Sequence, residues 1–385
     1  MRRPTLDCYA ITPPGIEGVA ARELAALGVR PGVTEPGGVA FRATTSQLYA
    51  ANLHLRTANR VLVRIAEFPA VAFHELERRA NRVPWEAYIA PGRPVRFRVT
   101  SRKSKLYHQE AVAERLQAAA DRQARGIPVA GETQPAGDDE EPDGGGQQIF
   151  VVRLVHDRVA ISADSSGELL HRRGYRQAGG KAPLRETIAA GMLLAAGYDG
   201  SVPLLDPMCG SGTIPIEAGL IARKIPPGRH RRFAFEHWPE FNAGLWASLK
   251  ERGRNQVLPH PPSEILGSDR DQGVIAAARD NAGRAGVSEG VTFRECSLSE
   301  IEPPGGPGLV LTNPPYGERL GDRDQLRNLY SQFGNVLRRR CPGWTVAMLS
   351  ARRELAAQVG LRFESSFRTS NGGIGVQLVR ALVGD

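Results

Sequence analysis

Short apolar runs alternate with segments of helical periodicity throughout the second half of the chain, from Leu184 onward. Parallel strands need a crossover between them, so this alternation is typical of a parallel sheet with helices on both faces. The last two runs flank Asn371-Gly372-Gly373, which predicts a closing hairpin. The predicted fold of residues 184–385 is therefore α/β, with a doubly wound, mostly parallel Rossmann-like sheet. The expected strands are 202–205, 265–268, 291–295, 308–311, 344–349, 362–369 and 374–382.

The turn after the first predicted strand is Asp206-Pro207-Met208-Cys209-Gly210-Ser211-Gly212-Thr213. Its glycines allow a ligand to approach the backbone closely and allow a helix to begin without steric conflict. By themselves they fit any nucleotide-binding loop equally well. The turn lacks the complete GxGxxG and P-loop patterns, so a pyrophosphate ligand is not favoured.

The second predicted strand ends in Ser268-Asp269-Arg270-Asp271. An acid at this point of a parallel sheet can hydrogen-bond both hydroxyls of a ribose, although Asp also serves as a helix N-cap. Carboxyl ends of parallel strands lie at one edge, which is where such sheets bind ligands. We therefore expect Asp269 to lie near the first turn, in a cofactor site.

Asn313-Pro314-Pro315-Tyr316 follows the fourth predicted strand of this sheet. Proline donates no N–H and fixes its own φ, so the strand ends abruptly in a rigid segment. The Asn313 oxygen and the Pro314 carbonyl could accept both hydrogens of an exocyclic amine, while the Tyr316 ring stacks on the base. The alternative is a simple surface turn.

Charge and cysteine usage narrow the class of protein. The 385-residue chain has a net charge of +9, which favours an anionic partner. Arginine supplies nearly all of the positive charge; it favours phosphate contacts, but a GC-rich coding bias would give the same preference for arginine. The four cysteines are far apart, without metal-ligand spacing, which predicts a reducing compartment and no metal site. With no signal peptide and no membrane-length apolar run, a cytoplasmic protein is expected.

The first half predicts two small α+β units, residues 1–68 and 69–165, followed by a linker, residues 166–183. Residues 126–148, rich in Gly, Pro and acids, are expected to form a flexible insertion. Ser101 to His108 is basic and rich in hydroxyls, so it predicts either a phosphate-binding segment or a solvated loop. The candidate RNA contacts here are Arg102, Lys103, Lys105, Tyr107 and His108.

Taken together, the three turns resemble those of class I S-adenosylmethionine-dependent RNA methyltransferases. Arg56-Thr57-Ala58-Asn59-Arg60, Pro84-Trp85-Glu86, Ser101 to His108 and Arg172 to Arg176 extend the likeness over nearly the whole chain. The closer resemblance is to the THUMP-containing, RlmL-type guanine-N2 methyltransferases of large-subunit rRNA. It implies a ferredoxin-like domain, a THUMP domain and a methyltransferase domain, in that order.

The same resemblance implies roles for individual residues. Asn313, Pro314, Pro315 and Tyr316 would hold the target base, and Arg172 and Arg173 would contact RNA. Ser297 stands where many class I enzymes have an acid that contacts the adenine. The implied S-adenosylmethionine site comprises Leu184, Thr187, Asp206, Pro207, Met208, Cys209, Gly210, Gly212, Thr213, Asp269, Arg270, Ser297 and Asn313.

The predicted function is methylation of a guanine N2 amine in RNA, with large-subunit rRNA as the expected substrate. Three alternatives remain: a tRNA guanine-N2 methyltransferase, a DNA adenine-N6 methyltransferase, and an inactive RNA-binding assembly factor. The residues at the three turns favour an enzyme over the last of these. Neither the target nucleotide nor the oligomeric state follows from the residues.

Overall fold

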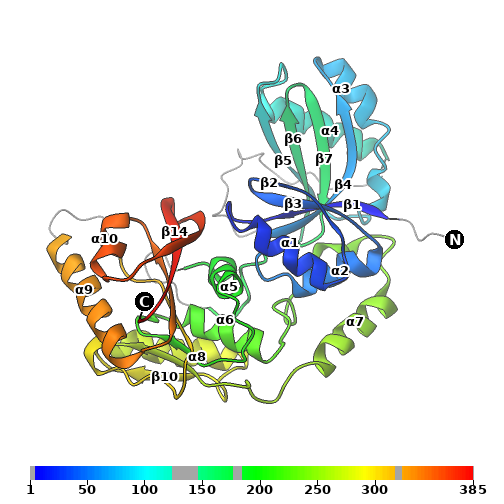
Figure 1. Cartoon of the computed structure of the whole chain (residues 1–385). Helices are drawn as coiled ribbons and strands as arrows, with labels where there is room; N and C mark the ends of the chain where they lie inside the picture. Colours follow the sequence, from blue (N-terminus) through cyan, green and yellow to red (C-terminus); the bar gives the residue numbers. More distant parts are fainter. Residues whose placement is uncertain (1–4, 124–145, 177–183, 317–322, 385) are drawn as a thin grey trace.

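A computed structural model of the chain describes residues 5–123, 146–176, 184–316 and 323–384. These residues form two lobes, each built on a seven-stranded sheet (Figure 1). The predicted flexible insertion lies almost wholly outside the described residues, as does the end of the predicted linker. In Figure 1 the N-terminal lobe is blue to cyan-green, and the C-terminal lobe runs from green to red.

The sheet of the N-terminal lobe has the strand order β2-β3-β1-β4-β7-β6-β5. β5 and β6 are parallel, and all other neighbours are antiparallel. β4 pairs with β1 on one side and with β7 on the other, so one sheet spans both predicted α+β units. The strands are β1 Leu6–Ile11, β2 Pro31–Glu35, β3 Gly38–Ala43, β4 Arg60–Pro69, β5 Val95–Arg102, β6 Gln148–Val155 and β7 Arg158–Asp164.

Four helices pack on this sheet and bury two apolar clusters, one under each part of the lobe. α2 begins with a capping box, in which Thr44 and Gln47 satisfy each other's backbone N–H groups. In the other cluster Trp85 is fully buried and meets Phe97 and Phe150 edge-on. The helices are α1 Glu17–Ala26, α2 Thr45–His54, α3 Phe73–Ala80 and α4 Gln109–Gln123.

The sheet of the C-terminal lobe confirms the doubly wound prediction. Its strand order is β10-β9-β8-β11-β12-β14-β13, with five parallel strands and the antiparallel hairpin β13–β14 at one edge. The predicted strand boundaries agree with the observed ones to within about two residues. The strands are β8 Leu204–Asp206, β9 Ile265–Asp269, β10 Thr292–Glu295, β11 Leu309–Thr312, β12 Thr345–Ser350, β13 Glu364–Asn371 and β14 Ile374–Leu382.

Helices cover both faces of this sheet because side chains along each strand alternate between two cores. On β11, Leu309 and Leu311 join the cluster under α5, α6 and α8, whereas Val310 joins the cluster under α9 and α10. The short helix α10 was not predicted from the sequence. The helices are α5 Glu186–Ala195, α6 Thr213–Ala222, α7 Ala243–Asn255, α8 Gln272–Ala285, α9 Arg323–Arg340 and α10 Arg353–Gln358.

The aromatic segment 229–262, which contains α7, holds the lobes together. Its Phe235 stacks on Tyr49 of α2 at a centroid distance of 4.2 Å, and Trp246 meets both rings edge-on. These side chains belong to the core of the N-terminal lobe, although they come from the C-terminal half of the sequence. In Figure 1, α7 accordingly lies beneath α2.

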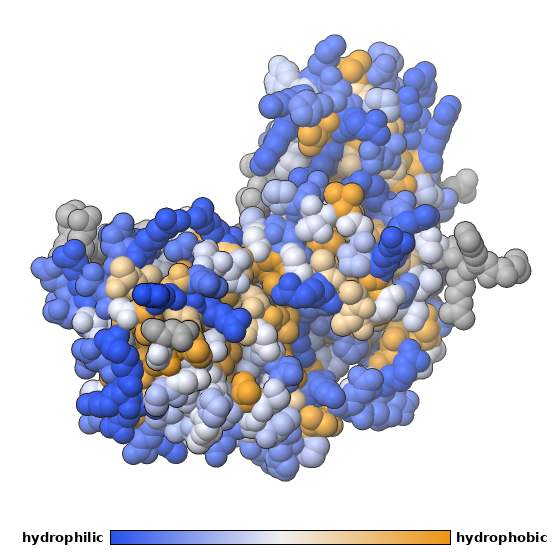
Figure 2. Space-filling view, viewed as in Figure 1, coloured by the Kyte–Doolittle hydropathy of each residue, from blue (hydrophilic) through white to orange (hydrophobic). Residues whose placement is uncertain are grey.

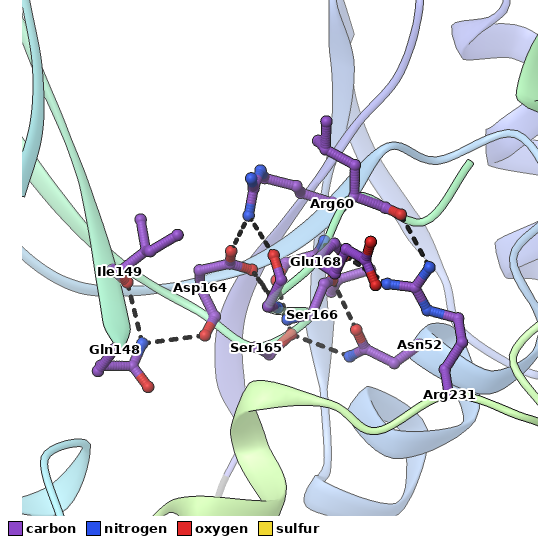
Figure 3. Close-up of polar contacts among 12 residues, drawn as sticks. Asn52, Arg60, Gln148, Ile149, Asp164, Ser165, Ser166, Glu168 and Arg231 are labelled. Carbon is purple, nitrogen blue, oxygen red and sulfur yellow. Dashed lines mark hydrogen bonds and ion pairs between the residues drawn. The ribbon is translucent and has the colours of Figure 1, made fainter. Parts of the chain in front are cut away.

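A buried polar network lies at the same junction (Figure 3). Arg60 and Asp164 form an ion pair, with 5% and 0% of their side chains exposed. Asn52 of α2 donates to Ser165 Oγ at 2.9 Å, and Ser166 donates to Asn52 Oδ1 at 2.7 Å. Such fully bonded buried groups fix one relative arrangement of the elements that carry them.

Two further properties bear on function. Within the described ranges, no helix is long and apolar enough to cross a membrane, and no cluster of His, Cys, Asp and Glu could hold a metal ion. On the face drawn in Figure 2, hydrophilic residues dominate the N-terminal lobe, and hydrophobic residues form only small groups. That face suits a polar partner better than an apolar one.

Candidate active site

The structure brings the three predicted turns to one edge of the C-terminal sheet. β9, β8 and β11 are consecutive neighbours and are parallel. Their carboxyl ends therefore meet at one edge, where Asp269 and Asp206 end β9 and β8 and Asn313 directly follows β11. β10 extends the row, with Glu295 in register with Asp269 and Cys296 N–H donating to the Asp269 carbonyl at 3.0 Å. This edge is the candidate active site.

The glycine turn after β8 is shaped by two left-handed residues. Gly212 has a φ of +85° and begins α6; a Cβ there would lie 2.9 Å from the Phe293 ring, so the helix packs too closely for a side chain. Gly210 has a φ of +50°, and a Cβ there would meet no described atom within 4 Å. The space beside Gly210 is therefore open to a ligand.

Asp269 is anchored by two backbone N–H groups. Its Oδ2 accepts from Gly210 at 3.1 Å, and its Oδ1 accepts from Asp271 at 3.1 Å. The N-cap of α8 is Asp271, which accepts from Gly273 at 2.8 Å and from Val274 at 3.2 Å. Each carboxylate oxygen has two lone pairs, so Asp269 keeps capacity for two further donors.

Asp206 is 1% exposed, and its Oδ1 accepts from the Met208 N–H at 3.2 Å. Burial raises the pKa of this carboxyl to about 7, and the nearby charge of Asp269 acts in the same direction. Hydrogen bonds from Thr312 and Met208 oppose the pKa shift. The group therefore titrates near neutrality, and a cation placed beside it would favour its ionised form.

The Asn-Pro-Pro-Tyr segment carries an unused acceptor. Asn313 Oδ1 is buried and has no hydrogen-bond partner among the described residues. A buried acceptor without a partner costs about 1–3 kcal/mol, so such an atom is usually explained by a ligand or water. Because β11 ends beside β8, this oxygen belongs to the edge that also carries Asp206.

Two residues that the sequence did not indicate hold this segment in place. Tyr330 of α9, 1% exposed, donates from its hydroxyl to the Pro315 carbonyl at 3.3 Å. Asn371, at the end of β13 and 5% exposed, donates from Nδ2 to the Tyr316 hydroxyl at 2.9 Å. Burial raises the pKa of Tyr316, whereas hydrogen bonds from Asn371 and Asn313 lower it.

Three predicted cofactor residues have side-chain partners in the fold, and their role toward the cofactor stays a prediction. Thr187 donates to Asn59 Oδ1 of the N-terminal lobe at 3.1 Å, and the Thr213 hydroxyl accepts from Arg176 at 2.7 Å. Leu184 is buried in the core cluster with α5 and α6. All three lie close to the linker, so they support the connection between the lobes.

Ser297 lies next to the active-site edge, just after β10 and Cys296. Its hydroxyl donates to Glu300 Oε2 at 2.8 Å and caps a short 3-10 helix, Leu298–Glu300. Arg270 is exposed, immediately after Asp269. A role for either residue toward the cofactor stays a prediction.

The predicted RNA contacts divide into two groups. Arg102, Lys103, Lys105, Tyr107 and His108 are exposed between β5 and α4, where the buried Leu106 anchors the segment. In contrast, Arg173 is buried in the linker, and its role toward RNA stays a prediction.

Arg173 is 6% exposed and donates to the carbonyls of Leu170 and Arg56, with Glu217 at 3.6 Å. Its guanidinium thus joins the linker to both lobes. Arg172, next to it, keeps 30% of its side chain exposed beside Glu168.

Comparison with known proteins identifies the family. Residues 173–380 match the RMKL-like methyltransferase domain, and residues 7–62 match the RlmL ferredoxin-like domain. A candidate RNA methyltransferase from Synechocystis is 35% identical over 378 residues, which cover 98% of this chain and 96% of that one. The chain belongs to the RlmL-like methyltransferase family. This membership agrees with the predicted resemblance and with the α/β fold.

Other members of the family extend the comparison. The ribosomal RNA large subunit methyltransferase K/L of Syntrophotalea carbinolica is 37% identical over 387 residues, covering 96% of this chain. Only 53% of that relative is covered, so the present chain spans about half the length of the K/L proteins it matches.

Two solved structures are also similar. A possible methylase from Clostridium difficile has a TM-score of 0.87 at 30% identity, with 99% of both chains covered. A candidate methyltransferase complexed with SAH has a TM-score of 0.86 at 29% identity, covering 99% of this chain and 98% of that one.

Proposed function

We propose that this protein methylates the exocyclic N2 amine of a guanine in large-subunit rRNA, with S-adenosylmethionine as methyl donor. The observation that carries the proposal is the buried, unpartnered Asn313 Oδ1 at an edge that also holds Asp269 and the open turn at Gly210. An acceptor beside a nucleoside-binding edge suits a substrate that donates hydrogens, as an amine does.

The residues of this edge suit the cofactor. The anchored carboxylate of Asp269 can accept from both ribose hydroxyls, and the titratable Asp206 can balance the positive charge at the methionine end. S-adenosylmethionine supplies, when bound, a methyl group that is already strongly electrophilic. The task left to the protein is to place the amine and to stabilise charge that develops on it.

Guanine N2 is a weak nucleophile because its lone pair is delocalised into the ring. Hydrogen bonds from the amine to Asn313 Oδ1 and to the Pro314 carbonyl would localise that lone pair. Tyr316 would stack on a base that has left its helix. Tyr330 and Asn371 position the segment through Pro315 and the Tyr316 hydroxyl. The methylated amine is acidic enough to lose its proton without a dedicated base.

The N-terminal lobe would bind the RNA. We assign a THUMP domain to residues 69–165, with the exposed segment Arg102 to His108 on phosphates. The names of the K/L relatives support rRNA as the substrate class. A second candidate is adenine-N6 methylation of DNA, since a Listeria monocytogenes structure, 31% identical with a TM-score of 0.84, is described as a predicted N6-adenine-specific DNA methylase.

Nucleoside analysis distinguishes these candidates. Purified protein is incubated with S-adenosylmethionine and, separately, protein-free large-subunit rRNA, total tRNA or unmethylated DNA, and the digested products are analysed by mass spectrometry. N2-methylguanosine in rRNA supports the proposal. The same nucleoside in tRNA alone reassigns the substrate, and N6-methyladenine in DNA assigns the protein to the second candidate.

A further inference from the structure

A cavity of about 520 Å³ lies between the linker, the segment Pro226 to Arg232 and the ends of α6 and α8. It is separate from the candidate active site. α8 begins just after Asp269 and runs for 14 residues, so its last residue, Ala285, lies about 20 Å from the active-site edge. The cavity is of the size that protein ligands occupy.

The cavity is strongly basic. Among the described residues Glu168 is its one carboxylate. Burial and the charge of Arg229 lower the pKa of His230, so the arginines carry the positive charge. The six arginines that line it come from the linker, from the segment after α6 and from α8: Arg172, Arg173, Arg229, Arg231, Arg232 and Arg284.

Part of this charge supports the fold. Arg231 donates to the Leu169 carbonyl at 2.8 Å, Arg229 donates to Ala285, and Arg284 donates to the Tyr175 carbonyl at 2.6 Å. Carbonyl contacts orient these guanidinium groups but do not neutralise them. A guanidinium has five N–H donors, so Arg229 and Arg284 keep several for another partner.

Carboxylates match only part of this positive charge. Arg172 lies 3.6 Å from Glu168, and Arg173 lies 3.6 Å from Glu217. Within the described part of the chain, no ion pair is formed by Arg229, Arg231, Arg232 or Arg284.

The unmatched positive charge affects the buried arginines of the cavity. Burial lowers the pKa of Arg231 to about 10. The charges of Glu168 and Asp164 oppose this shift, whereas those of Arg173 and Arg60 add to it. Arginine nevertheless stays protonated at neutral pH, so the repulsion persists in the folded protein. An anion in the cavity would relieve it.

Arg232 is not explained by a structural role. It is exposed, and it makes no hydrogen bond or ion pair to the described residues. His230 is exposed beside it, and Arg172 of the linker keeps 30% of its side chain exposed. The basic lining thus continues from the cavity to the protein surface. An RNA strand, whose phosphates repeat along its backbone, could contact such a lining at more than one point. Guanidinium groups also match phosphate oxygens bidentately.

We propose that this cavity binds backbone phosphates of the substrate RNA, at a second point about 20 Å from the base that is methylated. The proposal rests on the proposed function for the identity of the polyanion. It adds a contact made by the methyltransferase half and its linker, apart from the segment Arg102 to His108.

The test compares Arg172→Gln/Arg232→Gln with Arg340→Gln/Arg362→Gln in the full chain. The control pair is exposed in the same lobe, away from the cavity, and changes the net charge equally. Binding of protein-free large-subunit rRNA is measured over a range of salt concentrations. The slope of log affinity against log salt should fall by about 0.7–0.9 for each lost phosphate contact in the cavity variant only.

The rate of methyl transfer at saturating RNA should be unchanged in the cavity variant, with KM increased. Equal slopes in the cavity and control variants, with unchanged cofactor binding as the measure of folding, would overturn the proposal. Micromolar ATP binding that the cavity variant loses would overturn it as well, because the site would then belong to a free nucleotide.

The two proposals can fail separately. RNA binding is measured without methyl transfer, so a reduced salt slope together with no methylated product supports the cavity and refutes the proposed function. Normal formation of N2-methylguanosine by the parent protein, together with an unchanged salt slope in the cavity variant, supports the proposed function and refutes the cavity.

Discussion

Replacing Asn371 with alanine should slow methyl transfer without weakening cofactor binding. Asn371 is 5% exposed, lies 55 residues after Tyr316 in the sequence, and donates to the Tyr316 hydroxyl at 2.9 Å. Neither the glycine turn nor Asp269 contacts this amide through a described hydrogen bond. Its effect on the reaction should therefore pass through Tyr316.

The magnitude follows from the contact that is lost. A neutral hydrogen bond contributes about 0.5–1.5 kcal/mol net. If all of that is expressed in the transition state, the rate falls roughly two- to tenfold. A shift of the Tyr316 ring by about 1 Å would raise the loss toward 10²-fold. The free energy of unfolding should also fall, by about 1–3 kcal/mol, because a half-buried hydroxyl loses its donor.

A double-mutant cycle with Tyr316→Phe isolates this contact, since phenylalanine keeps the ring and removes only the hydroxyl. Rates of single-turnover methyl transfer are measured for the two single variants and the double variant. The double variant should react only slightly more slowly than Tyr316→Phe. This result would correspond to a coupling free energy of about 1 kcal/mol between Asn371 and the Tyr316 hydroxyl. Asn255→Ala, exposed on α7, serves as the control and should match the parent protein. If the activation free energies lost in the two single variants add fully in the double variant, Asn371 does not act through the Tyr316 hydroxyl.

Three further outcomes are expected. Asp269→Ala should weaken S-adenosylmethionine binding roughly tenfold or more in calorimetry, because charge-assisted hydrogen bonds contribute about 1.5–3 kcal/mol each; unchanged affinity in a folded variant would exclude a ribose contact. Alanine at Arg102, Lys103 and Lys105 should lower the salt slope of RNA binding by about 0.7–0.9 per phosphate contact, whereas an unaltered slope would leave the segment a solvated loop.

The third outcome concerns Asp206, whose pKa is about 7 when buried against 3.8 unperturbed. Its contribution to stability without cofactor is therefore present at acid pH and lost as pH rises toward 7. Cofactor affinity, measured by calorimetry between pH 6 and 8, should increase with pH, and Asp206→Asn should remove that dependence.

The sequence predicted the C-terminal sheet well because its signals are local. Each strand is an apolar run a few residues long, and each turn that bears Asp206, Asp269 or Asn313 follows directly. Parallel pairing then places the turns at one edge without knowledge of any distant contact. Local signals also located the closing hairpin, since its two apolar runs flank the turn Asn371-Gly372-Gly373.

Contacts between distant residues could not be predicted in this way. Asn371 was interpreted only as part of the turn Asn371-Gly372-Gly373, yet its amide points inward to Tyr316. Tyr330 lies in the middle of α9, and nothing local in the sequence marks its hydrogen bond to the Pro315 carbonyl.

The two linker arginines differ for a related reason. Arg172 and Arg173 are adjacent in the sequence, but only the fold determines that Arg173 is buried against Glu217 while Arg172 remains partly exposed. The aromatic segment likewise gave no sign that Phe235 and Trp246 complete the core of the other lobe.

The central claim is that Asn313 orients an amine for methylation, and one comparison tests it most directly. Methyl transfer to protein-free large-subunit rRNA and cofactor affinity are measured for the parent protein and Asn313→Ala. Loss of one positioned polar group at a reacting centre costs about 10²–10³ in rate. The orphan Oδ1 faces the substrate and not the cofactor in this account, so cofactor affinity should stay nearly intact. An Asn313→Ala protein that forms N2-methylguanosine at the parent rate would contradict the account.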